Sequence, residues 1–342
     1  MGHADDMSIA RLPKSLPKSL ACLLAAGVVA VSTNAAAFDL QGHRGTRGLA
    51  PENTLAAFST ALALGVTTLE LDLAMTRDDV LVVHHDSWLN PATTRDPGGN
   101  FLTDRGPAIR SLTLAEVQRY DVGRLKPGSA YAGRFPTQRS VDGERIPTLA
   151  ALFELVKRSG AEVRFNIETK LTPDIGADAP DPETFARATA AAIRDAGLAT
   201  RASVQSFDWR TLKVMAQIAP EIERVCLTSQ SPEEDTIQRG RPGPSPWTAG
   251  LDVDDFGGST PKLVKAAGCA VWSPDFRDLT PEWMAETKAL GLKVIPWTVN
   301  QPADMTRLID MGVDGIISDY PDRLREVVAA RGLPLPAPVT SR

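Results

Sequence analysis

The sequence predicts an α/β protein built as a single (β/α)8 TIM barrel. Three observations support this prediction. Short apolar segments alternate with helical patterns from residue 38 onward, eight of those segments are typical of parallel strands, and the polar clusters fall at or near strand ends. The alternative is an open doubly wound sheet, but Gly42-His43-Arg44-Gly45 lacks the glycine spacing expected after its first strand.

The expected elements follow one another in a regular order. Barrel strands are predicted at 38–43, 68–75, 162–170, 202–207, 222–227, 269–273, 293–299 and 315–318. Helices are predicted at 52–64, 149–158, 182–196, 210–219, 261–267, 281–290, 302–311 and 323–330. A further strand at 80–85 follows the second barrel strand after only four residues, so we expect an extra antiparallel hairpin there.

Two irregular stretches interrupt this order. Residues 86–147 are rich in Pro, Gly, Arg and Asp, with one short helix expected around 114–120, and we interpret them as an insertion over one end of the fold. A second irregular loop covers 229–259. A long irregular stretch in a compact domain is usually functional, so the insertion is expected to act as a lid.

The first residues have the pattern of a secretory signal peptide. Arg11, Lys14 and Lys18 precede an apolar run at 20–31, and small residues up to Ala37 follow it. An uncleaved anchor is the alternative, but a bilayer-spanning helix needs roughly 20 apolar residues. We therefore expect a periplasmic protein, secreted across the inner membrane, with no stable membrane insertion after cleavage. The predicted organisation is a signal peptide at 1–37, a barrel domain at 38–332 and a tail at 333–342.

The composition is that of a globular enzyme. The chain has 37 basic and 42 acidic residues and a net charge of −5, which gives no electrostatic reason to expect a nucleic acid partner. Cys226 and Cys269 both lie in apolar segments that are typical of strands. A disulfide between them and a pair of buried free thiols are both compatible with the sequence.

Three acidic residues are candidates for holding a cation. The second strand reads Thr-Leu-Glu-Leu-Asp-Leu-Ala-Met, so its leucines share one face and Glu70 and Asp72 share the other. Glu168 lies on the next strand of the barrel, after the apolar residues Phe165 and Ile167. Carboxylates in a buried strand are costly unless they bind a cation, and a set of oxygen ligands suits Ca²⁺ or Mg²⁺ better than zinc. Three unrelated surface carboxylates are the alternative.

Histidine and basic residues complete the candidate site. His43 follows the first strand, and His84 and His85 are adjacent, so strand alternation sends only one of these two rings towards His43. Two imidazoles can serve as acid and base near neutral pH. Arg44 and Lys170 bring positive charge next to the expected cation, which favours a phosphodiester substrate.

Ordered motifs along the chain resemble those of the glycerophosphodiester phosphodiesterase family. They are His-Arg-Gly, Pro-Glu-Asn-Thr, Glu-Leu-Asp, His-Asp, Glu-Thr-Lys, Gln-Ser-Phe, Trp-Thr-Val-Asn and Ser-Asp-Tyr-Pro, from residue 38 to about 325. The resemblance implies a metal-dependent barrel enzyme that hydrolyses glycerophosphodiesters to sn-glycerol 3-phosphate and an alcohol.

The resemblance also implies a role for each matching residue. His43 and His85 would be the acid–base pair. One divalent cation, with Ca²⁺ favoured over Mg²⁺, would be held by Glu70, Asp72 and Glu168. Substrate would meet Arg44, Glu52, Lys170, Phe207 and Trp297, with the role of Glu52 left open between a ligand and an orienter of a basic group. Asn53 is expected to cap the first helix instead of contacting substrate.

The sequence departs from the family pattern in two places, and it is also compatible with two rival functions. His84 stands where an apolar or aromatic residue is common, and Asn-Pro-Ala-Thr-Thr-Arg in the insertion replaces an Arg-Thr-Thr run, so the head-group contacts do not transfer. The rival functions are a phospholipase-D-like enzyme acting on lipid or lysolipid phosphodiesters and a non-catalytic phosphodiester-binding protein.

Overall fold

A computed structural model describes residues 37–339. Residues 1–36 of the predicted signal peptide and residues 340–342 of the predicted tail lie outside the described residues. No helix within residues 37–339 is both long enough and apolar enough to cross a membrane.

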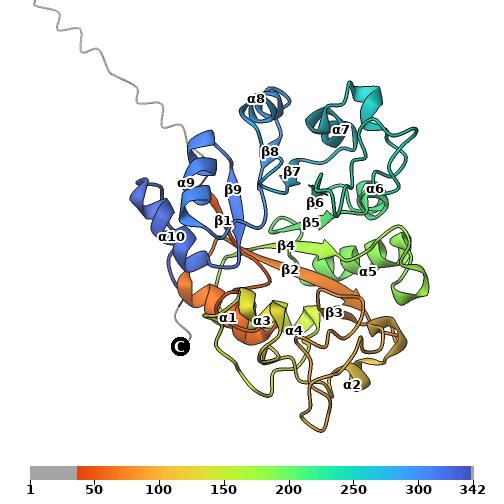
Figure 1. Cartoon of the computed structure of the whole chain (residues 1–342), viewed down its shortest axis with the longest axis vertical. Helices are drawn as coiled ribbons and strands as arrows, with labels where there is room; N and C mark the ends of the chain where they lie inside the picture. Colours follow the sequence, from red (N-terminus) through yellow and green to blue (C-terminus); the bar gives the residue numbers. More distant parts are fainter. Residues whose placement is uncertain (1–36, 340–342) are drawn as a thin grey trace, which may run out of the picture. The chain divides into compact units, whose positions relative to one another are not determined.

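The described strands form a barrel of parallel neighbours (Figure 1). Along the sheet the order is β8-β7-β6-β5-β4-β2-β1-β9, and β3 pairs antiparallel with β2, so the predicted barrel and hairpin are both confirmed. The bounds are β1 Asp39–Gly42, β2 Thr68–Met75, β3 Leu81–Val83, β4 Arg164–Thr169, β5 Ala202–Ser206, β6 Glu223–Thr228, β7 Val271–Pro274, β8 Lys293–Val294 and β9 Gly315–Ser318.

The seam of the barrel lies between β8 and β9. The strand predicted at 293–299 is regular only over Lys293–Val294, because Pro296 has no N–H to donate to a ladder. Individual hydrogen bonds still close the seam: the Asp314 amide donates to the Val294 carbonyl at 2.9 Å and the Ile317 amide to the Pro296 carbonyl at 3.0 Å. The barrel is therefore nearly closed.

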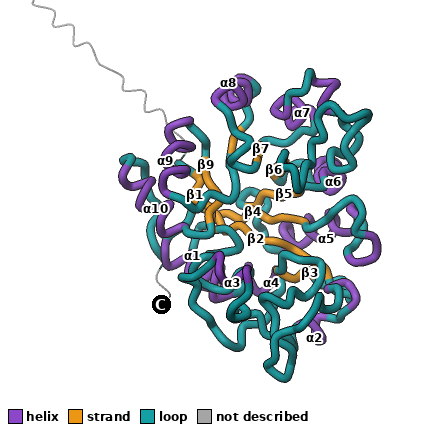
Figure 2. The backbone as a smooth tube through the Cα atoms, viewed as in Figure 1, coloured by secondary structure: helices purple, strands orange, loops and turns teal. Residues whose placement is uncertain are grey.

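Helices surround the strands on the outside of the barrel (Figure 2). The principal helices are α1 Leu55–Leu64, α4 Leu149–Ser159, α5 Pro182–Asp195, α6 Trp209–Ile218, α7 Thr260–Ala266, α8 Pro281–Ala289, α9 Pro302–Met311 and α10 Pro321–Ala330. Their ends follow local chemistry. In α4, for example, Thr148 accepts a hydrogen bond from the Ala151 amide at 3.0 Å, and Gly160 ends the helix in the left-handed conformation.

The capping prediction for the first helix is wrong by one residue. Thr54 is the N-cap of α1, because its hydroxyl accepts from the Ala57 amide at 3.2 Å. Asn53 instead has a positive φ of 56°, and its side-chain amide donates to Asp72 at 2.8 Å. The turn thus directs the Asn53 side chain towards β2, and the hydroxyl of Thr54 accepts the hydrogen bond at the start of the helix.

The insertion after the hairpin has a small apolar cluster of its own. Leu89, Ile109, Val117 and Val122 are buried there against the hairpin residue Val82. The predicted helix is present as α2, Leu114–Val117, and a second helix that was not predicted, α3, covers Ala130–Arg134.

The two cysteines within residues 37–339 form a disulfide. Cys226 lies in β6 and Cys269 lies just before β7, with their Cα atoms 5.9 Å apart. The structure therefore decides between the two alternatives left open by the sequence. Neither residue lines the polar cavity described below.

Candidate active site

Most of the predicted site residues gather around one cavity at the carboxyl ends of the strands. It has a volume of about 900 Å³. The predicted residues that line it are His43, Arg44, Glu70, His85, Glu168, Lys170, Phe207 and Trp297. Glu52 and Asp72 do not line the cavity, but both contact Arg44, which does. The ten residues therefore belong to one connected site.

Strand register brings the three acidic residues together. Alternation along β2 places Glu70 and Asp72 on the same face, and Asp72 stands directly opposite Glu168 of β4. All three are buried, and an oxygen from each lies within 4.8 Å of the others. Gln205 of β5 also reaches this group, since its side-chain amide donates to Glu70 at 2.9 Å.

The acidic group is electrostatically strained without a cation. Burial and repulsion by Asp72 and Glu168 raise the pKa of Glu70 well above its ordinary value. Burial likewise raises the pKa of Glu168 to about 7, although Lys170 opposes this shift. One buried oxygen, Oδ1 of Asp72, has no hydrogen-bond partner among residues 37–339. An oxygen-only donor set with one unsatisfied atom fits a hard divalent cation.

His43 is held by an aspartate from the opposite end of the chain. Its Nδ1 lies 2.6 Å from Oδ1 of Asp319; the same oxygen accepts a hydrogen bond from Arg47 at 2.7 Å, and Oδ2 accepts one from Asn300 at 2.7 Å. Burial raises the pKa of Asp319, but Arg47 and His43 outweigh it and hold that pKa below its ordinary value. An ionised carboxylate only accepts, so Nδ1 of His43 carries the proton and Nε2 keeps a lone pair.

The remaining ring nitrogen of His43 is placed for proton transfer. Nε2 lies 3.9 Å from Oε2 of Glu70, next to the acidic group. Burial and the positive charge of Arg47 lower the pKa of His43 to about 4, although Asp319 pulls the value up. The ring is therefore neutral at pH 7 and able to accept a proton.

His85 has a similar arrangement with an aspartate. Its Nδ1 lies 2.7 Å from Oδ1 of Asp86, whose second oxygen accepts from Asn90 at 2.7 Å. Burial, Arg44 and Lys170 lower the pKa of His85 well below its ordinary value. The neighbouring His84 does not line the cavity, and its Nε2 lies 3.3 Å from the Trp88 carbonyl. Of the doublet, only His85 therefore faces the candidate site.

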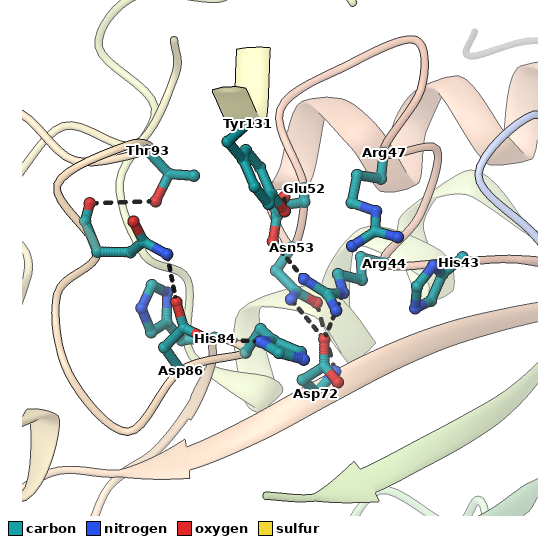
Figure 3. Close-up of polar contacts among 12 residues, drawn as sticks. His43, Arg44, Arg47, Glu52, Asn53, Asp72, His84, Asp86, Thr93 and Tyr131 are labelled. Atoms are coloured by element: carbon teal, nitrogen blue, oxygen red, sulfur yellow. Dashed lines mark hydrogen bonds and ion pairs between the residues drawn. The ribbon is translucent and has the colours of Figure 1, made fainter. Parts of the chain in front are cut away.

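Arg44 connects the first loop to the acidic group (Figure 3). Its backbone amide donates to Glu70 at 2.7 Å, and its guanidinium donates to Glu52 at 2.6 Å and lies 3.3 Å from Asp72. A positive φ of 50° at Arg44 turns the chain so that amide and side chain both face the site. Tyr131 from the insertion donates a hydrogen bond to the second oxygen of Glu52.

Lys170 and a set of aromatic rings also line the cavity. The Lys170 ammonium donates to Glu168 at 2.7 Å and lies 3.8 Å from Asp72. The Phe207 ring lies edge-on to Trp297, with centroids 5.3 Å apart, and Trp247 of the 229–259 loop lies 6.4 Å from Phe207. Part of the cavity wall is therefore cationic and part is apolar.

Several site residues were missed by the sequence analysis. Asp319 and Asn300 stand in the motifs Ser-Asp-Tyr-Pro and Trp-Thr-Val-Asn. These motifs contributed to the family resemblance, but the sequence did not indicate what either residue does. Arg47 shared the first loop with His43 and had no distinguishing spacing. Tyr131 had no signal at all, because its contact with Glu52 spans 79 positions of the chain.

The fold and the site together define a class of protein, a (β/α)8-barrel hydrolase. Its cavity combines buried carboxylates, histidines that each contact an aspartate, and the positively charged side chains of Arg44 and Lys170, which suit a phosphate ester. Residues 43–323 match the model of the Glycerophosphoryl diester phosphodiesterase family, and the chain belongs to this family.

Relatives and solved structures agree with this membership. The chain is 30% identical to the glycerophosphodiester phosphodiesterase of Caldanaerobacter subterraneus subsp. tengcongensis over 290 residues, which cover 85% of this chain and 97% of the relative. It is 29% identical to the Bacillus subtilis glycerophosphodiester phosphodiesterase over 293 residues, covering 83% and 84%. A crystal structure from Silicibacter pomeroyi DSS-3 that carries the same family name superimposes with a TM-score of 0.77 at 36% identity, covering 87% and 95%.

Proposed function

We propose that this chain hydrolyses glycerophosphodiesters to sn-glycerol 3-phosphate and an alcohol, using one divalent cation and two histidines. The observation that carries the proposal is the arrangement at one cavity of three buried carboxylates and two histidines that each have an aspartate on Nδ1. Membership of the family supports the same substrate class.

The cation would be held by Glu70, Asp72 and Glu168. When bound, it would supply positive charge that stabilises the charge developing on the phosphoryl oxygens. The three protein ligands offer only carboxylate oxygens, and Ca²⁺ accepts such sets with more tolerance of geometry than Mg²⁺ does. We therefore propose Ca²⁺ as the preferred ion.

The two histidines would move protons. Each holds its Nδ1 proton against an aspartate, so each Nε2 is the nitrogen left for the reaction. The attacking hydroxyl forms a bond to phosphorus while one neutral imidazole takes its proton, and the bond from phosphorus to the alcohol oxygen breaks as the other imidazole, protonated from solvent, gives its proton to the departing alkoxide. Such an acid–base pair suits the hydrolysis of an alkyl phosphate ester, because an alkoxide is a poor leaving group unless it is protonated.

The charged and aromatic walls would bind the two parts of the substrate. Arg44 and Lys170 stand beside the acidic group and would neutralise the phosphate. Phe207 and Trp297 would cover the carbon skeleton of the substrate.

The test is a substrate panel with purified protein. Glycerophosphocholine, glycerophosphoethanolamine and a lysophospholipid are incubated with Ca²⁺, with Mg²⁺ and with a chelator, and released glycerol 3-phosphate and free alcohol are measured. We expect turnover of the water-soluble diesters that the chelator abolishes. Turnover of the lysophospholipid alone would favour the phospholipase-D-like function, and binding without turnover would favour a binding protein.

We further propose that the protein works in the periplasm. The Cys226–Cys269 disulfide supports this location, because disulfides persist in oxidising compartments and are rare in the cytosol. Intact mass measured on a periplasmic extract should correspond to a chain that starts at Phe38. Recovery of the protein only from the cytosol, with both thiols reduced, would contradict the proposal.

A further inference from the structure

A segment of the insertion is attached to the loop that carries His43 and Arg44. The Thr137 hydroxyl donates to the Gly48 carbonyl at 2.9 Å, the Gln138 amide to the Arg47 carbonyl at 2.7 Å, and the Arg139 backbone amide to the Leu49 carbonyl at 2.9 Å. These three hydrogen bonds fix α3, which immediately precedes them, over the first βα loop.

Tyr131 of α3 is held in place by its neighbours. Its ring lies edge-on to Phe135 with centroids 5.3 Å apart, and Phe135 is itself buried beneath the guanidinium of Arg47, 4.8 Å from its ring. Burial, with a contribution from Glu52, raises the pKa of the Tyr131 phenol above its ordinary value, so it stays a donor at neutral pH.

The acceptor of that phenol proton is Glu52, and both of its carboxylate oxygens are engaged. Oε2 accepts from Tyr131 and Oε1 accepts from Arg44 at 2.6 Å. Glu52 does not belong to the group of three carboxylates suited to a cation. Its contacts are those of a residue that orients Arg44.

Arg44 is thus fixed from two directions. Glu52 holds one end of its guanidinium, and Asp72 lies 3.3 Å from its Nε. The chain of contacts from insertion to acidic group is Tyr131, Glu52, Arg44 and Asp72 (Figure 3). A planar guanidinium binds phosphate well only in a defined orientation, so whatever fixes Glu52 also fixes the phosphate contact.

We infer that Tyr131 is a positioning residue of this site: acting through Glu52, it sets the orientation in which Arg44 meets the phosphate. The inference rests on the proposed function, because it assigns Arg44 to the substrate phosphate. It gives the insertion a specific task, which is to complete the phosphate-binding contact from outside the barrel.

The test is a double-mutant cycle on Tyr131→Phe and Glu52→Gln. Two quantities are measured for the wild type, both single variants and the double variant. One is kcat/KM for glycerophosphocholine with saturating Ca²⁺, and the other is the dissociation constant of sn-glycerol 3-phosphate by calorimetry. Tyr131→Phe removes one hydrogen bond to a charged group, so it should lower kcat/KM roughly tenfold and raise the dissociation constant roughly tenfold. In the Glu52→Gln background the same change should cost less than about twofold, because the residue acts through Glu52.

A matched control separates positioning from general damage to the insertion. Tyr120→Phe removes the same hydroxyl from a tyrosine that packs on the insertion's own apolar cluster and does not line the cavity. It should leave both quantities within about twofold of the wild type. The melting temperature of Tyr131→Phe should stay within a few degrees of the wild type, and its Ca²⁺ affinity should match that of the wild type.

Three outcomes would overturn the inference. Tyr131→Phe could behave like the wild type in both measurements, or its effect could be undiminished in the Glu52→Gln background, which would show action independent of Glu52. A wild-type protein that neither turns over the diester nor binds glycerol 3-phosphate removes the phosphate role of Arg44, and the inference fails together with the proposed function. In the first two outcomes the wild type is active, so the failures are distinguishable.

Discussion

Asp319 determines the chemical state of His43. It is ionised, because Arg47 and Asn300 donate to it, and it therefore fixes the proton of His43 on Nδ1. It also raises the pKa of His43 against the stronger lowering effects of burial and Arg47. One buried carboxylate thus sets both which nitrogen is free to accept a proton and how basic that nitrogen is.

Asp319→Asn tests this role at the level of a single residue. The amide can donate to Nδ1 and so favour the wrong tautomer, and kcat should fall on the order of 10²-fold or more. Losing a negative neighbour also lowers the pKa of His43 further below about 4. If His43 is the base, the acid limb of the kcat–pH profile should therefore stay in place or move to lower pH.

The profile is measured between pH 3.5 and 8, with the melting temperature as the control for folding. An acid limb that moves upward in Asp319→Asn would contradict this account of His43. Unchanged kcat at pH 7 would also count against it.

The register between neighbouring strands brings the acidic residues of the site together. The pairing of β2 with β4 places Asp72 opposite Glu168, and the alternation that predicted one acidic face on β2 is confirmed. The strand predicted at 293–299 was too long, although Pro296 in the sequence was a signal that its ladder is interrupted. The sequence left the state of the two cysteines open as well, because pairing depends on the distance between β6 and the turn before β7.

The disulfide should stabilise the barrel without affecting the site. It closes a loop over a separation of 43 residues, for which the loop-entropy model predicts about 4 kcal/mol. Cys226→Ala/Cys269→Ala should therefore have a lower free energy of unfolding in urea, by up to that amount, with kcat within about twofold of the wild type. Equal unfolding free energies for the two proteins, measured under oxidising conditions, would contradict the expectation.

The whole molecule brings together residues from both ends of the barrel sequence. His43 and Asp319 are separated by 276 positions and meet because β1 pairs with β9. The barrel, the hairpin, the insertion and the acidic group could be predicted, since each leaves a local pattern in the sequence. Contacts such as Asp319 with His43 and Tyr131 with Glu52 could not, because they depend on barrel closure and on how the insertion folds back.

His43 and His85 are proposed to act on a phosphodiester at this cavity. The most direct test is the rate of glycerophosphocholine hydrolysis by His43→Gln, His85→Gln and the matched control His84→Gln, with saturating Ca²⁺ and with melting temperatures measured in parallel. We expect losses of roughly 10²- to 10⁴-fold for the first two variants and a rate within about threefold of the wild type for His84→Gln. Near-normal activity of His85→Gln together with an inactive, folded His84→Gln would show that His84, and not His85, is the catalytic histidine of the doublet.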